Sequence, residues 1–345
     1  MNGRSLLLLH CLVTLGSPAL LQGEDIPAFK GSIQRLDPAL DALIAPEVEI
    51  EVLASGFNWS EGPTWFGDRI LFSDVPENTV YQWKEGDTTA SEFLKPSGLT
   101  GPPTSDRPQG SNGLAVTASG ELILCQHGDR RVAKLTNEGD FTTLADRFEG
   151  HRFNSPNDVV IAQDGTLFFT DPPYGLVGLN ESPQREADFN GVYRVSPDGE
   201  VQAIIRDLTF PNGIALSPDE KTLYVAVSDP EDGHIRSYTL DPKTGIASAP
   251  RRLFEAESLK KFGNLPGSFD GMAVSQKRHI WTTAPGGVII LTPEGRHLGS
   301  ILTGQRTGNC TFGGPDGSDL YITADMFLLR VRTLTQGLIQ GRSTK

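Results

Sequence analysis

The sequence predicts an all-β chain folded as a six-bladed β-propeller, a single domain that covers roughly residues 40–335. Three observations predict this class. A segment with one pattern recurs six times, its copies begin 39 to 58 residues apart, and each copy contains two short apolar strands around a turn. The 38 glycines and 24 prolines of the chain suit a fold with many tight turns.

The repeated segment has a constant internal order. It begins with a polar residue, continues as a short apolar strand, turns about seven residues later and returns as a second apolar strand. The six copies are EGPTWFGDRILFSD from Glu61, NGLAVTASGELILCQH from Asn112, NDVVIAQDGTLFFTD from Asn157, NGIALSPDEKTLYVAVSD from Asn212, DGMAVSQKRHIWTTA from Asp270 and NCTFGGPDGSDLYITAD from Asn309.

A third strand and usually a fourth follow each copy, but the last copy has only a third, near FLLRVRT. The segment VEIEVLA at Val48–Ala54 stands before the first copy and has the character of an unpaired fourth strand. We therefore expect this N-terminal strand to complete the last blade and close the ring, which removes exposed strand edges. The alternatives are a β-sandwich or a solenoid, and a solenoid favours a more regular period with explicit caps.

The N-terminus has the layout of a secretory signal peptide. A basic residue precedes the apolar run from Leu6, and small and polar residues follow near Gly23. The prediction is a signal peptide at residues 1–23, a single mature domain at residues 24–345, and export to the periplasm or the medium, with an uncleaved anchor as the alternative. Cys125 and Cys310 then remain, and we expect both to be buried thiols rather than a disulfide.

The formal net charge of −13 argues against nucleic acid as a partner, because a phosphate backbone would be repelled. Beyond the signal peptide, no segment is apolar for long enough to span a membrane. A small molecule is the partner that we expect, and the sequence does not indicate an oligomeric state.

The first residues of the six copies form the main candidate site. The first strand of each propeller blade lines the central channel, so equivalent residues of all blades converge at one end of it. Each of the six carries a carboxylate or amide oxygen, the ligand type that Ca²⁺ and Mg²⁺ prefer. The alternative is that Asn and Asp serve as turn residues here. Glu61 is a poor turn residue, and its place in the set favours a metal site.

The second strands return to the same face, so their ends should rim the site. Those ends carry Asp74, His127, Asp171, Asp229 and Asp325. His127 is a candidate for proton transfer, because an imidazole at a channel rim can shuttle protons near neutral pH. The long segments 95–111, 172–190 and 256–269 should overhang the site as an entrance or lid.

Several motifs together resemble the gluconolactonase-like family, which includes senescence marker protein and related lactonases and phosphotriesterases. They are EGPTW, SPNDV with LFFTDPPYG, FPNGIALSPD and FDGMAV, and they span nearly the whole mature chain in order. The resemblance implies a six-bladed propeller with a divalent cation in its channel, commonly Ca²⁺, although Mg²⁺, Mn²⁺ or Zn²⁺ would also fit. It assigns the ligands to Glu61, Asn157, Asn212 and Asp270, and leaves Asn112 and Asn309 either to support those ligands or to contact the substrate.

The hypothesis that follows is an exported, metal-dependent lactonase acting on gluconolactone or a similar sugar lactone. The cation would polarise the carbonyl, and activated water would attack it. Asp270 is the preferred catalytic base, with His127 or Asp171 as alternatives. The competing hypotheses are a phosphotriesterase at the same site, and a non-catalytic propeller that binds carbohydrate or protein around a structural ion.

Overall fold

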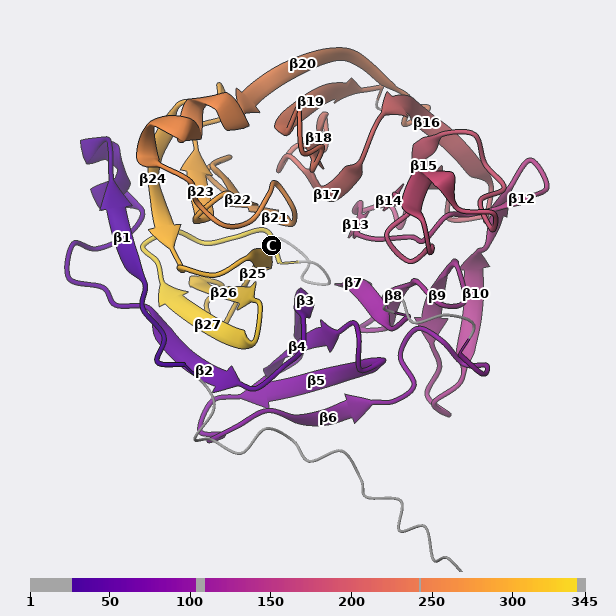
Figure 1. The fold of residues 1–345 in the computed structure, drawn as a ribbon, viewed down its shortest axis with the longest axis horizontal. Helices are drawn as coiled ribbons and strands as arrows, with labels where there is room; N and C mark the ends of the chain where they lie inside the picture. The colour runs from indigo at the N-terminus through magenta and orange to yellow at the C-terminus, as the bar shows by residue number, and fades with distance from the viewer. Residues whose placement is uncertain (1–26, 104–108, 242, 340–345) are drawn as a thin grey trace, which may run out of the picture.

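The computed structural model describes residues 27–103, 109–241 and 243–339. Within them, six sheets of four or five strands stand around one axis, each with its first strand at the centre and its last strand at the periphery (Figure 1). The prediction of a six-bladed β-propeller is confirmed. The predicted signal peptide lies outside the described residues, and no helix among the described residues has the length and apolar character needed to cross a bilayer.

The strands of blades 1 to 3 are β3 to β6 (Ser60–Phe66, Arg69–Asp74, Thr79–Lys84, Ser91–Leu94), β7 to β10 (Ser111–Val116, Leu122–Gln126, Arg131–Leu135, Phe141–Ala145) and β13 to β16 (Val159–Ile161, Leu167–Asp171, Asn190–Val195, Val201–Leu208). Those of blades 4 to 6 are β17 to β20 (Pro211–Leu216, Thr222–Val227, His234–Leu240, Ala247–Glu255), β21 to β24 (Met272–Val274, Ile280–Ala284, Gly287–Leu291, His297–Leu302) and β25 to β27 (Thr307–Gly313, Asp319–Ala324, Phe327–Arg332). The remaining elements are β11 (Arg147–Phe148), β12 (His151–Arg152), η1 (Pro38–Ala42), η2 (Leu179–Glu181) and η3 (Ala256–Phe262).

The turn between the first two strands of a blade lies at the far end from the candidate site. In blade 3, β13 pairs antiparallel with β14 as far as Ile161 and Leu167. The Asp164 carboxylate accepts a hydrogen bond of 2.8 Å from Thr166 N, and Gly165 has a φ of 90°, which favours glycine. The Asp-Gly pair is therefore a structural device that reverses the chain.

An N-terminal strand closes the ring as predicted. Strand β2 (Glu51–Ser55) pairs antiparallel with β27 and becomes the outer strand of blade 6. Its bounds differ slightly from the predicted Val48–Ala54. Strand β1 (Ser32–Arg35) pairs with β24 and adds a fifth strand to blade 5, which the repeat pattern did not predict. The N-terminal segment therefore stabilises two neighbouring blades.

The hydrophobic core lies between successive blades. One cluster joins blades 5 and 6, where the fully buried Trp281 and Phe312 meet edge to face with ring centroids 5.4 Å apart. Leu40 of η1 is 0% exposed and belongs to the same cluster. Cys125 and Cys310 are buried and free, as predicted. Each blade contributes apolar side chains to both of its interfaces, so the ring is held by packing as well as by closure.

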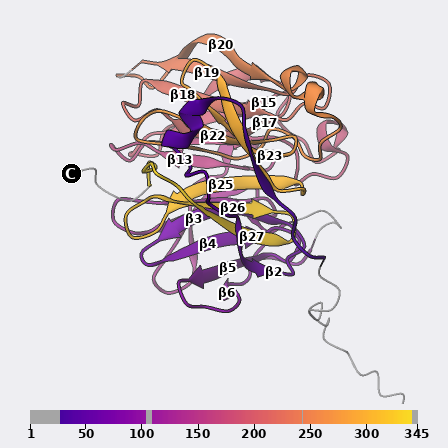
Figure 2. The same ribbon diagram turned by 90° about the vertical axis from the view of Figure 1, so that its left-hand side faces the viewer.

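The segment after β27 crosses the face opposite the candidate site. Leu338 N donates to Val274 O at 2.9 Å, and Gly337 N donates to Gly317 O at 3.0 Å, so the segment bridges turns of blades 5 and 6. Leu338 and Ile339 pack against the core clusters of blades 4 to 6 and blade 1. Figure 2 shows the blades from the side, with β25, β26 and β27 of blade 6 beside β3 to β6 of blade 1. This segment covers part of the far face of the ring.

Candidate active site

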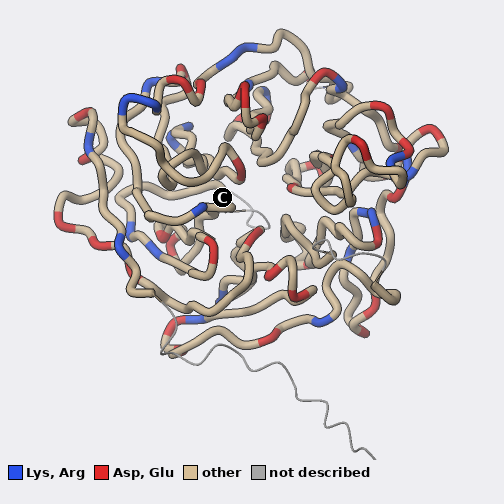
Figure 3. Tube along the Cα trace, viewed as in Figure 1, with Lys and Arg blue, Asp and Glu red and all other residues tan. Residues whose placement is uncertain are grey.

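The six first residues of the repeats all lie at the central ends of the first strands. Glu61, Asn112, Asn212 and Asn309 belong to β3, β7, β17 and β25, whereas Asn157 and Asp270 lie two residues before β13 and β21. Five of the six are less than 9% exposed, and Asp270 is partly exposed. Some acidic positions of the chain lie near the centre of the ring, and others are spread around its periphery (Figure 3). We call these six side chains the central ring.

Close backbone packing brings the central ring together. A Cβ at Gly62 would lie 2.0 Å from Asn112 O, and a Cβ at Gly213 would lie 2.1 Å from Asp270 O. Neither position can hold a larger residue without moving the next blade. Gly113 N also donates to Asn157 O at 2.7 Å, which links blade 2 to blade 3.

Hydroxyl groups on the second strands reinforce these links. Ser73 Oγ donates to Asn112 O at 2.8 Å, and Thr170 Oγ1 donates to Asn212 O at 2.7 Å. Each bond runs from the second strand of one blade to the central residue of the next. Sequence analysis missed these residues, although Ser or Thr in FSD and FTD was the available signal.

The three central amides of blades 2 to 4 form a chain. Asn112 Nδ2 donates to Asn157 Oδ1 at 3.0 Å, and Asn157 Nδ2 donates to Asn212 Oδ1 at 2.5 Å. Asn212 Nδ2 in turn donates to Ser228 Oγ at 3.1 Å, and this hydroxyl contacts Tyr174 OH at 2.5 Å. This series of hydrogen bonds fixes which end of each amide group faces its neighbour. It leaves the buried Asn112 Oδ1 without a hydrogen-bond partner.

Two carboxylates complete the central ring. Glu61 accepts hydrogen bonds of 3.2 Å from Trp59 Nε1 and Gly62 N. Burial raises the pKa of Glu61 to about 8, and the nearby Asp158 carboxylate adds to the shift. Burial likewise raises the pKa of Asp270 well above its ordinary value, and the charges of Glu61 and Asp158 add to it. No cationic side chain of the described residues offsets these charges.

Asp158 is a third carboxylate at the centre that sequence analysis missed. It is 7% exposed, and its oxygens accept hydrogen bonds from Val159 N at 3.0 Å and Ile214 N at 3.2 Å. Burial raises the pKa of Asp158 to about 6. The available signal was an exception in the repeat, because Gly follows the first residue in four of the six copies and Asp158 replaces it in blade 3.

His127 contacts the central ring directly. It follows β8, is 3% exposed, and its Nε2 lies 3.3 Å from Asn157 Oδ1. Burial lowers the pKa of His127 to about 4, so the imidazole is neutral at pH 7. Its Nδ1 is buried and has no hydrogen-bond partner. A neutral imidazole with a free nitrogen has the form that a proton acceptor needs.

Asp171 lies near the rim, but its carboxylate is turned into the protein. It is 0% exposed and accepts hydrogen bonds of 2.8 Å from both Asn154 N and Ser155 N. Asp74 makes the equivalent contacts with Asn58 N and Trp59 N in blade 1. This geometry favours a structural role for Asp171, which fixes the segment that leads into Asn157.

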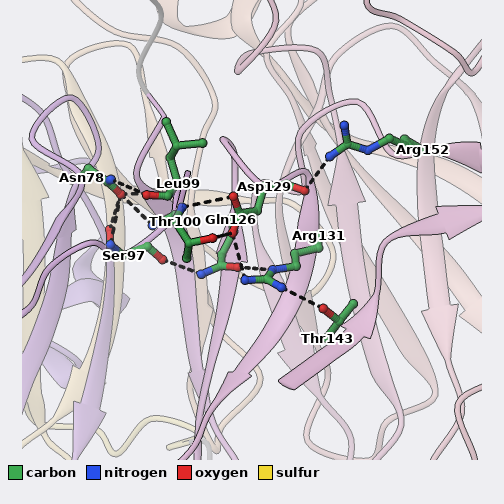
Figure 4. A network of polar contacts seen from close by, with 10 residues as sticks. Asn78, Ser97, Leu99, Thr100, Gln126, Asp129, Arg131, Thr143 and Arg152 are labelled. Carbon is green, nitrogen blue, oxygen red and sulfur yellow. Dashed lines mark hydrogen bonds and ion pairs between the residues drawn. The ribbon is translucent and has the colours of Figure 1, made fainter. Parts of the chain in front are cut away.

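The segment 95–101 is firmly attached to the rim of blades 1 and 2. Asn78 Oδ1 accepts hydrogen bonds from the backbone amides of Ser97, Gly98 and Leu99 at 2.7 to 3.1 Å. Asp129 accepts from Thr100 Oγ1 at 2.8 Å and pairs with Arg131 at 2.9 Å (Figure 4). These contacts use Arg131 for structure, and they hold the start of the predicted overhanging segment in place.

The donor set of the central ring fits a divalent cation. Two carboxylates without a cationic partner and the amide oxygens beside them are hard oxygen ligands. Among these amide oxygens, Asn112 Oδ1 is unpaired, whereas Asn157 Oδ1 and Asn212 Oδ1 each accept a hydrogen bond from a neighbouring amide. No group of three His, Cys, Asp or Glu among the described residues is arranged to hold a metal ion. A cation here would therefore need amide oxygens beside its carboxylates.

Comparison with known proteins identifies the family. The model of the SMP-30/gluconolactonase/LRE-like region matches residues 59–325. The chain belongs to this family. It is 41% identical over 316 residues to the gluconolactonase of Zymomonas mobilis, covering 89% of this chain and 87% of that protein. It is 25% identical over 284 residues to bovine regucalcin, covering 80% of this chain and 86% of that protein.

Solved structures agree with this membership and confirm the family resemblance seen in the motifs. A gluconolactonase from Xanthomonas campestris superposes with a TM-score of 0.74 at 30% identity, over 94% of this chain and all of that one. A regucalcin from Agrobacterium tumefaciens, described as a calcium-binding protein, shares the fold with a TM-score of 0.66 at 18% identity, over 85% of this chain and 96% of that one.

Proposed function

We propose that the chain is an exported lactonase of the gluconolactonase type, which opens a sugar lactone at the central ring with the help of a divalent cation. The 41% identity to a gluconolactonase over most of both chains supports lactone hydrolysis. The observation that carries the proposal of cation dependence is the pair Glu61 and Asp270 at the centre of the ring. The negative charge of Glu61 adds to the raised pKa of Asp270, and no cationic side chain among the described residues offsets either carboxylate.

Glu61, Asn157, Asn212 and Asp270 would hold the cation, with Ca²⁺ as the first candidate. The calcium-binding regucalcin among the structural relatives supports this choice. When bound, the cation would polarise the lactone carbonyl and lower the pKa of a neighbouring water. The protein contributes a fixed set of oxygens, because the chain of amides holds Asn157 and Asn212 in one orientation.

The remaining steps fall to side chains that can move a proton. Water adds to the carbonyl carbon, the bond from this carbon to the ring oxygen breaks, and the proton lost by the water is finally gained by the ring oxygen. Asp270 is partly exposed and is the preferred acceptor for this proton. His127 is the alternative, because it is neutral and one of its nitrogens is free. Asp171 is less well oriented for this role.

Substrate contacts would come from residues around the cation. Asn112 has an unused amide oxygen and is the better oriented of the two predicted contacts. Asn309 Oδ1 already accepts a hydrogen bond of 2.8 Å from Cys310 N. The Asn309 side chain also interacts with Asp158 and lowers the pKa of that carboxyl. Export by a signal peptide at residues 1–23 would place the enzyme in the periplasm or the medium.

A panel of sugar and aliphatic lactones tests the proposed activity. Each would be assayed with purified protein by titration of the acid released, before and after chelation and with each candidate metal added back. Hydrolysis of a sugar lactone that is lost on chelation and restored by Ca²⁺ supports the proposal. Metal-independent hydrolysis would contradict the proposed cation, and no hydrolysis of any lactone would contradict the activity.

A further inference from the structure

Asp158 occupies a position in the repeat that is glycine in four of the other five blades. Gly follows the first residue of the copy in blades 1, 2, 4 and 5, and these residues are Gly62, Gly113, Gly213 and Gly271. The space that a side chain would need at Gly113 is taken by Asp158, whose Oδ1 would lie 2.7 Å from a Cβ there. The carboxylate of blade 3 therefore extends into the channel and packs against blade 2.

The carboxylate of Asp158 also joins blades across the channel. It accepts a hydrogen bond from Ile214 N of blade 4 at 3.2 Å, and the side chain of Asn309 from blade 6 lies on the same narrow cavity and lowers the pKa of Asp158. Blades 3 and 6 are three positions apart in a ring of six, so they face each other across the axis. Asp158 and Asn309 thus form a pair that spans the channel. Both residues line a narrow cavity of about 30 Å³ in its interior.

The Asp158 carboxylate lies near the proposed cation ligands and acts on them through its charge, but it is not itself placed as a ligand. It lines the same cavity as Gly62, the residue after Glu61, and it packs against Gly113, the residue after Asn112. Its negative charge also adds to the raised pKa values of Glu61 and Asp270. Its two oxygens already accept hydrogen bonds from Val159 N and Ile214 N. The three carboxylates together do not form a metal-holding group among the described residues.

We propose that Asp158, held across the channel by Asn309, is a positioning residue that strengthens cation binding at the central ring through its charge rather than by contact. The inference rests on the proposed cation site. A buried negative charge near a divalent ion is weakly screened, and it attracts the ion even when a layer of other atoms separates them. Asn309 in this account supports Asp158 and does not touch the substrate.

The test is Ca²⁺ binding to chelator-treated protein, measured by calorimetry, for the wild type and three variants. D158N removes the charge, and the double variant D158N/N309D moves the charge to the other end of the same pair. D319N is the matched control, because Asp319 is a buried carboxylate at the start of β26, the far end of blade 6 from the central ring, and no carboxylate of the ring contributes to its pKa. Melting temperatures with chelator present show whether each variant is folded.

We expect D158N to weaken Ca²⁺ binding by about tenfold or more, the double variant to recover it to within about threefold, and D319N to leave it unchanged. Equal binding by D158N and wild type would overturn the proposal. A folded double variant that binds as weakly as D158N would also overturn it, because the role would then lie in the exact backbone contacts. If D158N does not fold, the double variant is compared with the wild type alone: Ca²⁺ binding within about threefold supports the proposal, and binding weaker by about tenfold or more overturns it. Absence of Ca²⁺ binding by the wild type would instead remove the cation site itself, and the inference with it.

Discussion

Asn157 and Asn212 share a hydrogen bond of 2.5 Å, from Nδ2 of the first to Oδ1 of the second, and it joins blades 3 and 4 at the centre of the ring. The bond has a direction, because Asn212 Nδ2 is itself bonded to Ser228 Oγ. The amides of the site are therefore oriented by protein contacts before any ligand binds. Such orientation lowers the cost of arranging oxygens around an ion.

Ser228→Ala should weaken cation binding although Ser228 is not a proposed ligand. Without its hydroxyl, Asn212 Nδ2 loses one of its partners, and the Asp270 carboxylate that also interacts with this amide holds it less firmly in one orientation. We expect about a tenfold loss of Ca²⁺ affinity by calorimetry. Ser248→Ala, an exposed position in the same blade, is the matched control. Unchanged affinity in Ser228→Ala would show that the orientation of Asn212 does not depend on this contact.

Asp171→Asn should change the pH dependence of stability. Burial raises the pKa of Asp171 from 3.8 to about 7 in the folded protein, so the folded state binds this proton more tightly than the unfolded chain. The contribution of Asp171 to the free energy of unfolding therefore increases as the pH falls from about 8 towards 5. Urea unfolding at both pH values should show a smaller difference for the variant than for the wild type.

The exposed Asp140→Asn variant is the control, and its free energy of unfolding should differ between the two pH values by as much as that of the wild type. An equal difference in the Asp171 variant would contradict the assigned environment of this carboxylate.

The same Asp171→Asn variant also tests whether Asp171 has a structural or a catalytic role. Folded Asp171→Asn protein should retain lactonase activity within about tenfold, whereas loss of a catalytic base would cost about 10²-fold or more.

Leu40→Ala should destabilise the propeller strongly, although Leu40 precedes the matched family region. Leu40 is 0% exposed and packs in the cluster between blades 5 and 6. Removal of a fully buried leucine side chain costs about 2–5 kcal/mol in the free energy of unfolding. Val52→Ala, on the exposed side of β2, should cost much less. Equal small effects would mean that the N-terminal segment is not part of the folding unit.

Residues 1–23 should be absent from the mature protein. The predicted signal peptide ends near Gly23 or Glu24. Intact-mass measurement of protein recovered from the periplasm or medium should give an N-terminus close to these residues. Recovery of the full-length chain from the cell interior would contradict the prediction of export.

The fold was predictable because a propeller repeats one pattern. The six copies, their turns and the unpaired segment near Val48 determined the blade number and the closure, both of which the structure confirms. Strand β1 was not predictable in this way, since it has no equivalent in the other blades. Its pairing with β24 depends on the path of the chain around the outside of the ring.

The central ring was predictable because its members occupy one register. The contacts of the individual side chains were not predictable, because they depend on how neighbouring blades pack together. Asp171 ends a strand at the rim, yet two backbone amides turn it inward. Asp158 departs from the glycine of other copies, and only its contacts with Ile214 and Asn309 reveal why.

The most direct test of the account is hydrolysis of gluconolactone by wild-type and Glu61→Gln protein, each treated with chelator and then titrated with Ca²⁺. Glu61 is a proposed ligand, and its replacement by an isosteric amide removes one of the two carboxylate charges in the central ring. We predict that the wild type loses activity on chelation and regains it with Ca²⁺, while the folded variant falls by about 10²-fold or more and binds Ca²⁺ more weakly. A Glu61→Gln variant with full activity and full Ca²⁺ binding would contradict the central claim.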